Sequence, residues 1–137
     1  SEADLHKILE SRKLDPGVAR LAQGSASLAL LLADTERQQE RESFLGAVFE
    51  ALAAPDLVSG LRLAESRRGD RQELGDLLGH FAQELSTRAR ELSESDVRAA
   101  QRLAEKHELV LATLLELEKN VQPALALESM IVRLRRA

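Results

Sequence analysis

Histidines are the side chains best suited to catalysis or metal binding in this sequence, but none stands in a recognised motif. His6, His80 and His107 have no second histidine and no cysteine at ligand spacing. The run that begins His107-Glu108 starts like the helical zinc-protease motif, yet Leu111 occupies the position of the second histidine ligand. We therefore expect no metal site and interpret all three histidines as surface or partly buried residues.

The other candidate groups also lack the patterns of an active site. The glycines form neither a Gly-x-Gly-x-x-Gly run nor a Gly-Lys-Ser/Thr run, which excludes a P-loop. Acidic pairs such as Asp70 with Glu73 are typical of helix starts, where carboxylates complement the helix dipole. The absence of cysteine excludes disulfides, thiolate metal sites and cysteine nucleophiles. We expect no catalytic residue and no cofactor.

Charge and aromatic content argue against direct nucleic-acid binding. The formal net charge is −4, from 19 basic and 23 acidic residues, so no overall positive field attracts a phosphate backbone. The only aromatic residues are three phenylalanines in apolar helical patterns, and a stacking platform for bases needs exposed rings. Any interface must therefore rest on aliphatic packing and arginine.

Apolar residues recur at intervals of three and four along the whole chain, and Ala, Leu, Glu and Arg dominate the composition. This periodicity predicts an all-α fold. The longest uninterrupted apolar run, residues 28–33, is far shorter than the roughly 20 residues that a membrane helix needs. We expect a soluble, cytoplasmic protein.

Helix breakers predict a small first domain over residues 1–35 that contains three short helices. The first covers Ala3 to Arg12, and the second starts at Pro16 after an Asp15 cap and ends before Gly24. The third runs over residues 25–33. A boundary follows at about residue 35, where longer helices begin.

The second domain, residues 36–137, is predicted to be a bundle of five helices. Thr35 opens a capping-box pattern for its first helix, and Ser93 or Ser95 is the expected cap of its fourth. The predicted helices run from Thr35 to just before Pro55, from Leu57 to Ser66, from Asp70 to about Ser93, from there to about Lys119, and from Pro123 onward.

The last helix carries large apolar residues on more than one face. One stripe serves the core of its own domain, and Leu127, Ile131 and Leu134 form a second, predicted to contact another subunit together with Arg133. The alternative is insertion between two other helices, which would place both stripes in the core. Arg135 and Arg136 are typical of cations that stabilise a helix C-terminus.

Two segments of the chain together resemble the clamp-loader ATPase family of bacterial DNA replication. Residues 18–30 resemble the end of the small helical lid of that family, where a helix, a Gly-Ser turn and a second helix follow one another. Residues 120–134 look like the closing helix of its collar domain. The resemblance implies that residues 1–35 are the lid of an AAA+ module and that residues 36–137 are the helical collar.

One departure from the family pattern bears on activity. The lid of an active subunit usually carries a phosphate-sensing arginine shortly after the Gly-Ser turn, and Leu28 occupies the matching position here. Because leucine cannot pair with a phosphate, the resemblance implies a subunit whose lid takes no part in hydrolysis. The nucleotide-binding domain is expected to precede Ser1.

The resemblance implies an assembly role and no enzyme activity. Collars of five subunits pack into a ring, so the expected partners are the gamma/tau and delta subunits of a DNA polymerase III clamp loader. The sliding clamp and primed DNA would be indirect partners, and neither a membrane nor a small-molecule substrate is expected. The alternatives are a stand-alone helical regulatory or adaptor module and the equivalent region of a gamma/tau subunit.

Overall fold

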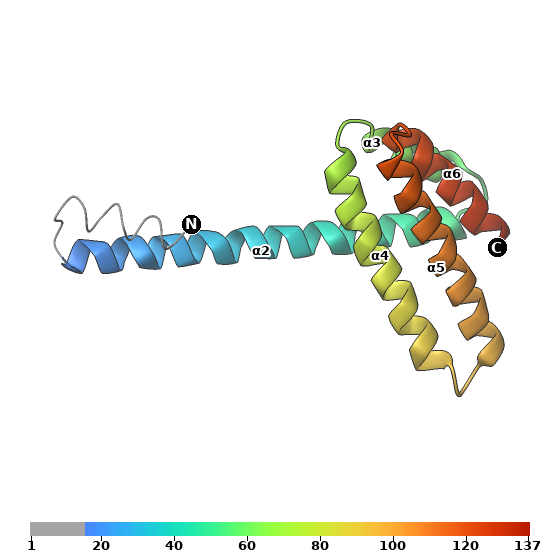
Figure 1. Cartoon of the computed structure of the whole chain (residues 1–137), viewed down its shortest axis with the longest axis horizontal. Coiled ribbons are helices and arrows are strands. Elements are labelled where there is room, and N and C mark those ends of the chain that lie inside the picture. The colour runs from blue at the N-terminus through green and yellow to red at the C-terminus, as the bar shows by residue number, and fades with distance from the viewer. Residues whose placement is uncertain (1–15) are drawn as a thin grey trace. The chain divides into compact units, whose positions relative to one another are not determined.

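The structure, a computed structural model, describes residues 16–137, and every regular element in that range is an α-helix (Figure 1). This confirms the all-α fold class. The helices are α2 (Pro16–Ala53), α3 (Val58–Ser66), α4 (Arg71–Leu92), α5 (Val97–Glu118) and α6 (Pro123–Arg136). The chain divides into two compact units, Ser1–Glu40 and Arg41–Ala137, and α2 contributes to both. The helix predicted over Ala3 to Arg12 lies outside the described residues.

The continuity of α2 is the main difference from the sequence-based expectation. Gly24 does not end a helix and Thr35 does not start one. The Thr35 hydroxyl donates a hydrogen bond of 2.9 Å to the carbonyl oxygen of Leu31, one turn earlier, and so does not act as a cap. One glycine costs a helix about 1 kcal/mol, which the surrounding alanines and leucines offset. The prediction of separate helices over 16–23 and 25–33 is therefore wrong.

The starts of α4 and α6 agree with the sequence. The Asp70 carboxylate accepts a hydrogen bond of 2.9 Å from the backbone N–H of Glu73, as the acidic pair predicts. Pro123 stands in the first turn of α6, where its missing N–H costs nothing. The side chain of Gln122 caps this helix.

The start of α5 requires a correction. The N-cap is Asp96, whose carboxylate accepts from the Ala99 N–H at 3.1 Å, and neither Ser93 nor Ser95 fills this role. The Ser93 hydroxyl instead donates to the carbonyl oxygen of Arg90 at 2.8 Å, at the end of α4.

A tight turn connects α5 to α6. Asn120 adopts a positive φ of 66°, a left-handed conformation that asparagine tolerates better than most residues. The Val121 N–H then reaches the Glu116 carbonyl at 3.2 Å, and the Asn120 N–H reaches the Leu117 carbonyl at 3.3 Å. This Schellman motif ends α5 and sets the direction in which α6 begins.

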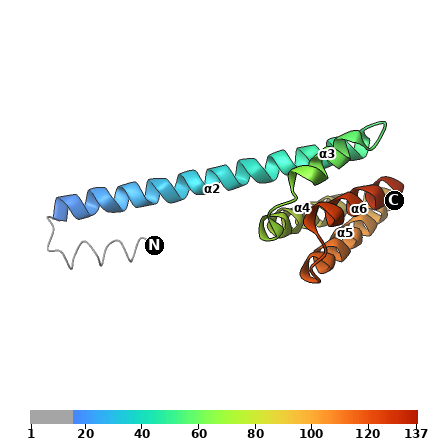
Figure 2. The ribbon, with the colours of Figure 1, turned by 90° about the horizontal axis from the view of Figure 1, so that it is seen from above.

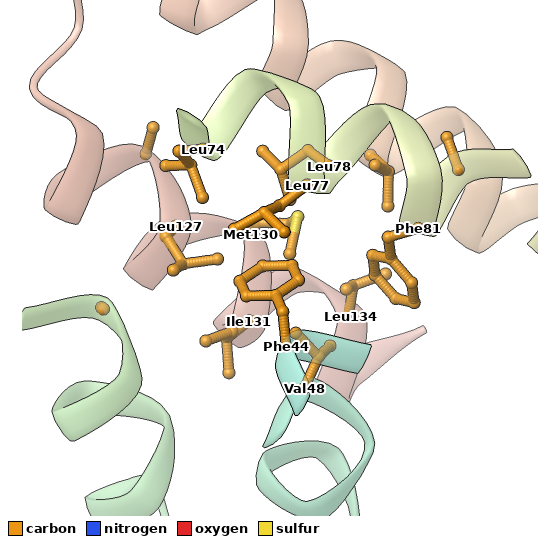
Figure 3. Close-up of a cluster of buried hydrophobic side chains, with 14 of the residues drawn as sticks. Phe44, Val48, Leu74, Leu77, Leu78, Phe81, Leu127, Met130, Ile131 and Leu134 are labelled. Carbon is orange, nitrogen blue, oxygen red and sulfur yellow. The ribbon is translucent and has the colours of Figure 1, made fainter. Parts of the chain in front are cut away.

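The second unit has one hydrophobic core. Helices α4 and α5 pack against each other, and α6 contacts both α5 and α3. Figure 2 shows α6 between these two neighbours. The rings of Phe49 and Phe81 meet edge to face, with centroids 5.7 Å apart. Figure 3 shows the central cluster, whose labelled members are Phe44, Val48, Leu74, Leu77, Leu78, Phe81, Leu127, Met130, Ile131 and Leu134.

Candidate assembly surfaces

The structure corrects the expectation that α6 presents an outward-facing apolar stripe. The side chains of Leu127, Ile131 and Leu134 are only 0%, 1% and 2% exposed. They lie in the same cluster as Phe44 and Phe81 (Figure 3). These three residues therefore belong to the core of their own unit and offer no surface to another subunit.

The position of α6 explains why it is apolar on more than one face. The helix packs against α3 on one side and α5 on the other, so two of its faces are internal. Its approach to α3 is close, because a Cβ added at Gly60 would lie 3.0 Å from Cγ2 of Ile131. Insertion between two helices, the alternative left open by the sequence, is the arrangement that the structure shows.

Arg133 points to a neighbour within its own chain. Its Nη1 lies 3.1 Å from the Oε1 of Glu116 on α5, and the two side chains are 47% and 29% exposed. An ion pair this open to solvent contributes little to stability. A role for Arg133 toward another subunit stays a prediction.

Arg135 anchors α6 to the end of α2 within the second unit. Its Nη1 donates to the carbonyl oxygens of Ala51 and Ala54, at 2.8 and 2.7 Å. These carbonyls lie at and just beyond the end of α2, where a helix leaves its last acceptors without intrahelical partners. This arginine in the last turn of α6 thus donates hydrogen bonds to the carbonyl oxygens at the end of a second helix. Its position in the sequence did not indicate that role.

Arg71 makes the equivalent contact to the α5–α6 turn. Its Nη1 donates to the carbonyl oxygens of Leu117 and Val121, at 2.6 and 2.7 Å. These hydrogen bonds fix the start of α4 to the turn that sets the direction of α6. Both arginines bridge residues that are far apart along the chain, so local sequence patterns carried no signal for either.

Two further arginines lie against phenylalanine rings. The guanidinium carbon of Arg88 is 4.4 Å from the ring centroid of Phe49, and that of Arg67 is 5.6 Å from the ring centroid of Phe44. Arg67 also pairs with Glu73 at 3.0 Å. Arg67 therefore contributes to packing and ion pairing inside the unit.

The candidate histidines do not form a cluster among residues 16–137. No cluster of three or more His, Asp or Glu side chains that could hold a metal exists in this range. His80 and His107 are both half-buried, and they lie on different helices. His6 lies outside the described residues. No helix in the same range is long and apolar enough to cross a membrane.

The second unit carries exposed aliphatic side chains that the sequence reasoning missed. On α5, Val97, Leu111 and Leu115 are all exposed, and Val97, Ala104 and Leu111 recur every seventh residue, so they share one helix face. Solvent-facing positions of a helix are usually polar, which makes an aliphatic row here notable. The exposed large aliphatic residues of the other elements are Leu57, Val58 and Leu61 at α3 and Leu125 at α6.

A shallow groove adjoins this row. It lies between the end of α4 and the start of α5, and its volume is about 380 Å³. Most of the lining side chains are small, and five of the nine lining residues are polar: Ser86, Arg90, Ser93, Gln101 and His107. Its apolar side chains include Ala89, Val97, Ala100 and Ala104. Small side chains leave room for larger ones from a partner.

In the first unit, the apolar surface of α2 is more extensive. Between residues 16 and 33 the only charged residue is Arg20. Leu21, Leu28 and Leu31 are 74%, 57% and 61% exposed, and Leu30 and Leu32 are exposed as well. A helix that is apolar on several faces is normally covered by other elements.

Neither a protein-family model, a curated protein nor a solved structure matches this chain.

Proposed function

We propose that this chain is a protein-assembly module with no catalytic role of its own. The observation that carries the proposal is the row of exposed aliphatic side chains on α5, Val97, Leu111 and Leu115. The half-buried Arg71 and Arg135 of the same unit bind backbone carbonyl oxygens inside it. Apolar surface of this kind is stabilised by a partner that removes it from water. Assembly energy then comes from aliphatic packing, because the chain has no tyrosine or tryptophan to act as an anchor.

The finer proposal is that the module is the lid and collar of the delta prime subunit of a bacterial DNA polymerase III clamp loader. Its support is the resemblance of residues 120–134 to the closing collar helix, together with an all-helical unit of suitable size before it. The lid part of the resemblance is weakened, because α2 runs without a turn through Gly24 and Ser25. Leu28 at the phosphate-sensing position favours delta prime over gamma/tau.

In this role the chain holds subunits in a ring with gamma/tau and delta, and the ring places the sliding clamp on primed DNA. The outer face of α5 is the proposed contact with a neighbouring collar. The buried residues of α6 contribute indirectly, because their packing fixes the position of α5 relative to α4 and α3. Arg71 contributes in the same way, because it ties α4 to the α5–α6 turn.

The proposal is tested by co-expressing the full subunit with the gamma/tau and delta proteins of the same genome. We expect the wild-type chain to co-elute with them on gel filtration, and the double variant L111E/L115E to lose at least ~10-fold in recovered complex. The matched control is R102E/E105K, which changes exposed charges on a different side of the same helix and should keep the complex. Circular dichroism checks that both variants stay folded.

Two outcomes would contradict the clamp-loader proposal. One is a wild-type chain that does not co-elute with gamma/tau and delta. The other is a gene in which no nucleotide-binding domain is encoded upstream of Ser1. If both outcomes occur, and the chain instead binds another protein through a surface that L111E/L115E disrupts, the chain is an adaptor module.

A further inference from the structure

The leucines of α2 in the first unit divide into two opposite sides of the helix. Leu21, Leu28 and Leu32 follow one another at spacings of seven and four, and Leu31 lies at the edge of the same face. Leu30 is two residues from Leu28 and therefore points away from this face. We call the face formed by Leu21, Gly24, Ser25, Leu28, Leu31, Leu32 and Thr35 the leucine face.

We infer that the leucine face pairs with the same face of a second copy of this chain, in antiparallel orientation with the twofold axis at Leu28. The residues along the face are complementary in size on the two sides of this position. Large side chains occupy one side of Leu28 where small ones occupy the other. Leu31 and Leu32 on one copy lie opposite Gly24 and Ser25 on its partner.

This pairing fills space that the leucine face leaves open. A Cβ placed on Gly24 would meet no atom within 4 Å, so nothing in the described structure fills the position beside this glycine. A leucine of the second copy fits there, and small residues at the contact allow two helix axes to come close. A parallel pair in register would instead place Gly24 against Gly24 and leave a void. The interface is isologous, as a twofold dimer requires.

Charge agrees with the antiparallel orientation. Arg20 and Asp34 lie on the same edge of the leucine face, and the twofold axis at Leu28 brings Arg20 of one copy within about half a turn of Asp34 of the other. Asp34 already attracts Arg37 weakly at 3.9 Å, with both side chains exposed. The ends of the helix pair thus carry opposite charges across the interface. This inference concerns the first unit alone and does not depend on the proposed function.

The first experiment is sedimentation of the chain over the micromolar range. We expect a concentration-dependent rise in mass to twice 15.1 kDa. Leu28→Glu should raise the dissociation constant at least ~30-fold, because it places a charge at the centre of the interface in both copies. The matched control is Leu30→Glu, which changes a leucine that is 52% exposed, close to the 57% of Leu28, on the opposite side.

The outcomes separate the alternatives. A chain that stays monomeric throughout overturns the inference. Equal weakening by Leu30→Glu also overturns it, because the leucine face would then not be the interface. Exchange of the two edge charges is a further check: Arg20→Glu should weaken the dimer and the double variant R20E/D34R should restore it. Circular dichroism of each variant must show unchanged helix content.

Cross-linking tests the orientation, and the absence of native cysteine makes single-cysteine variants clean probes. Oxidation should link two copies of Leu28→Cys, because both thiols lie at the axis. Leu21→Cys alone should not link, whereas a mixture of Leu21→Cys and Thr35→Cys should. Efficient linking of Leu21→Cys with itself would show a parallel pair and would contradict the antiparallel arrangement.

Discussion

Two helices of this chain carry more aliphatic side chains than one buried face needs, and they use them in opposite ways. On α6, Leu127 and Ile131 are fully internal because α3 and α5 cover two sides of the helix. On the first part of α2, Leu21 and Leu28 stay more than half exposed. Surplus apolar residues therefore mark either a helix that is covered on two sides or an exposed apolar surface, and the number of neighbouring helices decides which.

The contrast is tested most severely by placing a charge in each helix. Leu127→Glu should destabilise the second unit by at least ~4 kcal/mol, because the carboxylate is buried without a partner. Leu28→Glu should change the stability of the monomer by less than about 0.5 kcal/mol. Urea unfolding followed by circular dichroism measures both changes in stability, at protein concentrations low enough for the chain to be monomeric. If the two variants lose the same unfolding free energy, the contrast between a buried α6 and an exposed α2 is wrong.

Arg135→Met tests how much the contact with the end of α2 stabilises the position of α6. The carbonyl oxygens of Ala51 and Ala54 lose a charged donor, so we expect a loss of about 2–3 kcal/mol in unfolding free energy. Arg136→Met is the control, since Arg136 is exposed and its replacement should change stability by less than about 0.5 kcal/mol. If both variants unfold at the same urea concentration as the wild type, the contact to α2 contributes nothing.

Gly60→Ala measures how closely α3 approaches α6. The new Cβ would stand 3.0 Å from Cγ2 of Ile131, so the usual gain in helix propensity should be reversed to a net loss of about 1 kcal/mol. Gly79→Ala, which meets no atom within 4 Å, should instead stabilise α4 by about 0.5–1 kcal/mol. Thermal unfolding of the two variants gives the sign of each change. A stabilised Gly60→Ala protein would mean that the two helices can move apart freely.

Helix boundaries in the second unit were largely predictable because they depend on local chemistry. Asp70, Gln122 and Pro123 act within one turn of their own backbone, so the sequence around them is sufficient to place the helix starts. The cap of α5 was assigned to the wrong residue, because serines and an aspartate stand close together and the Ser93 hydroxyl is bound to the end of α4. Such errors move a boundary by a few residues and leave the fold class unchanged.

The continuity of α2 was not predictable from breakers alone. Gly24 and Thr35 are common helix-end signals, but each costs only about 1 kcal/mol or less in a helix interior. The many alanines and leucines around them provide enough helix propensity to continue through both positions. The proposed three-helix arrangement of the first unit depended on weak local signals, and the structure of residues 16–40 differs from it for that reason.

Sequence patterns alone were enough to predict the all-α class and the positions of most helices in the second unit. These follow from periodicity and from contacts within one helical turn. Tertiary packing was needed to place Leu127, Ile131 and Leu134 in the core and to bring Arg71 and Arg135 to carbonyl oxygens distant in sequence. It also leaves leucines of α5 and of the first part of α2 exposed. Burial depends on which helices lie beside a residue, and no local pattern contains that information.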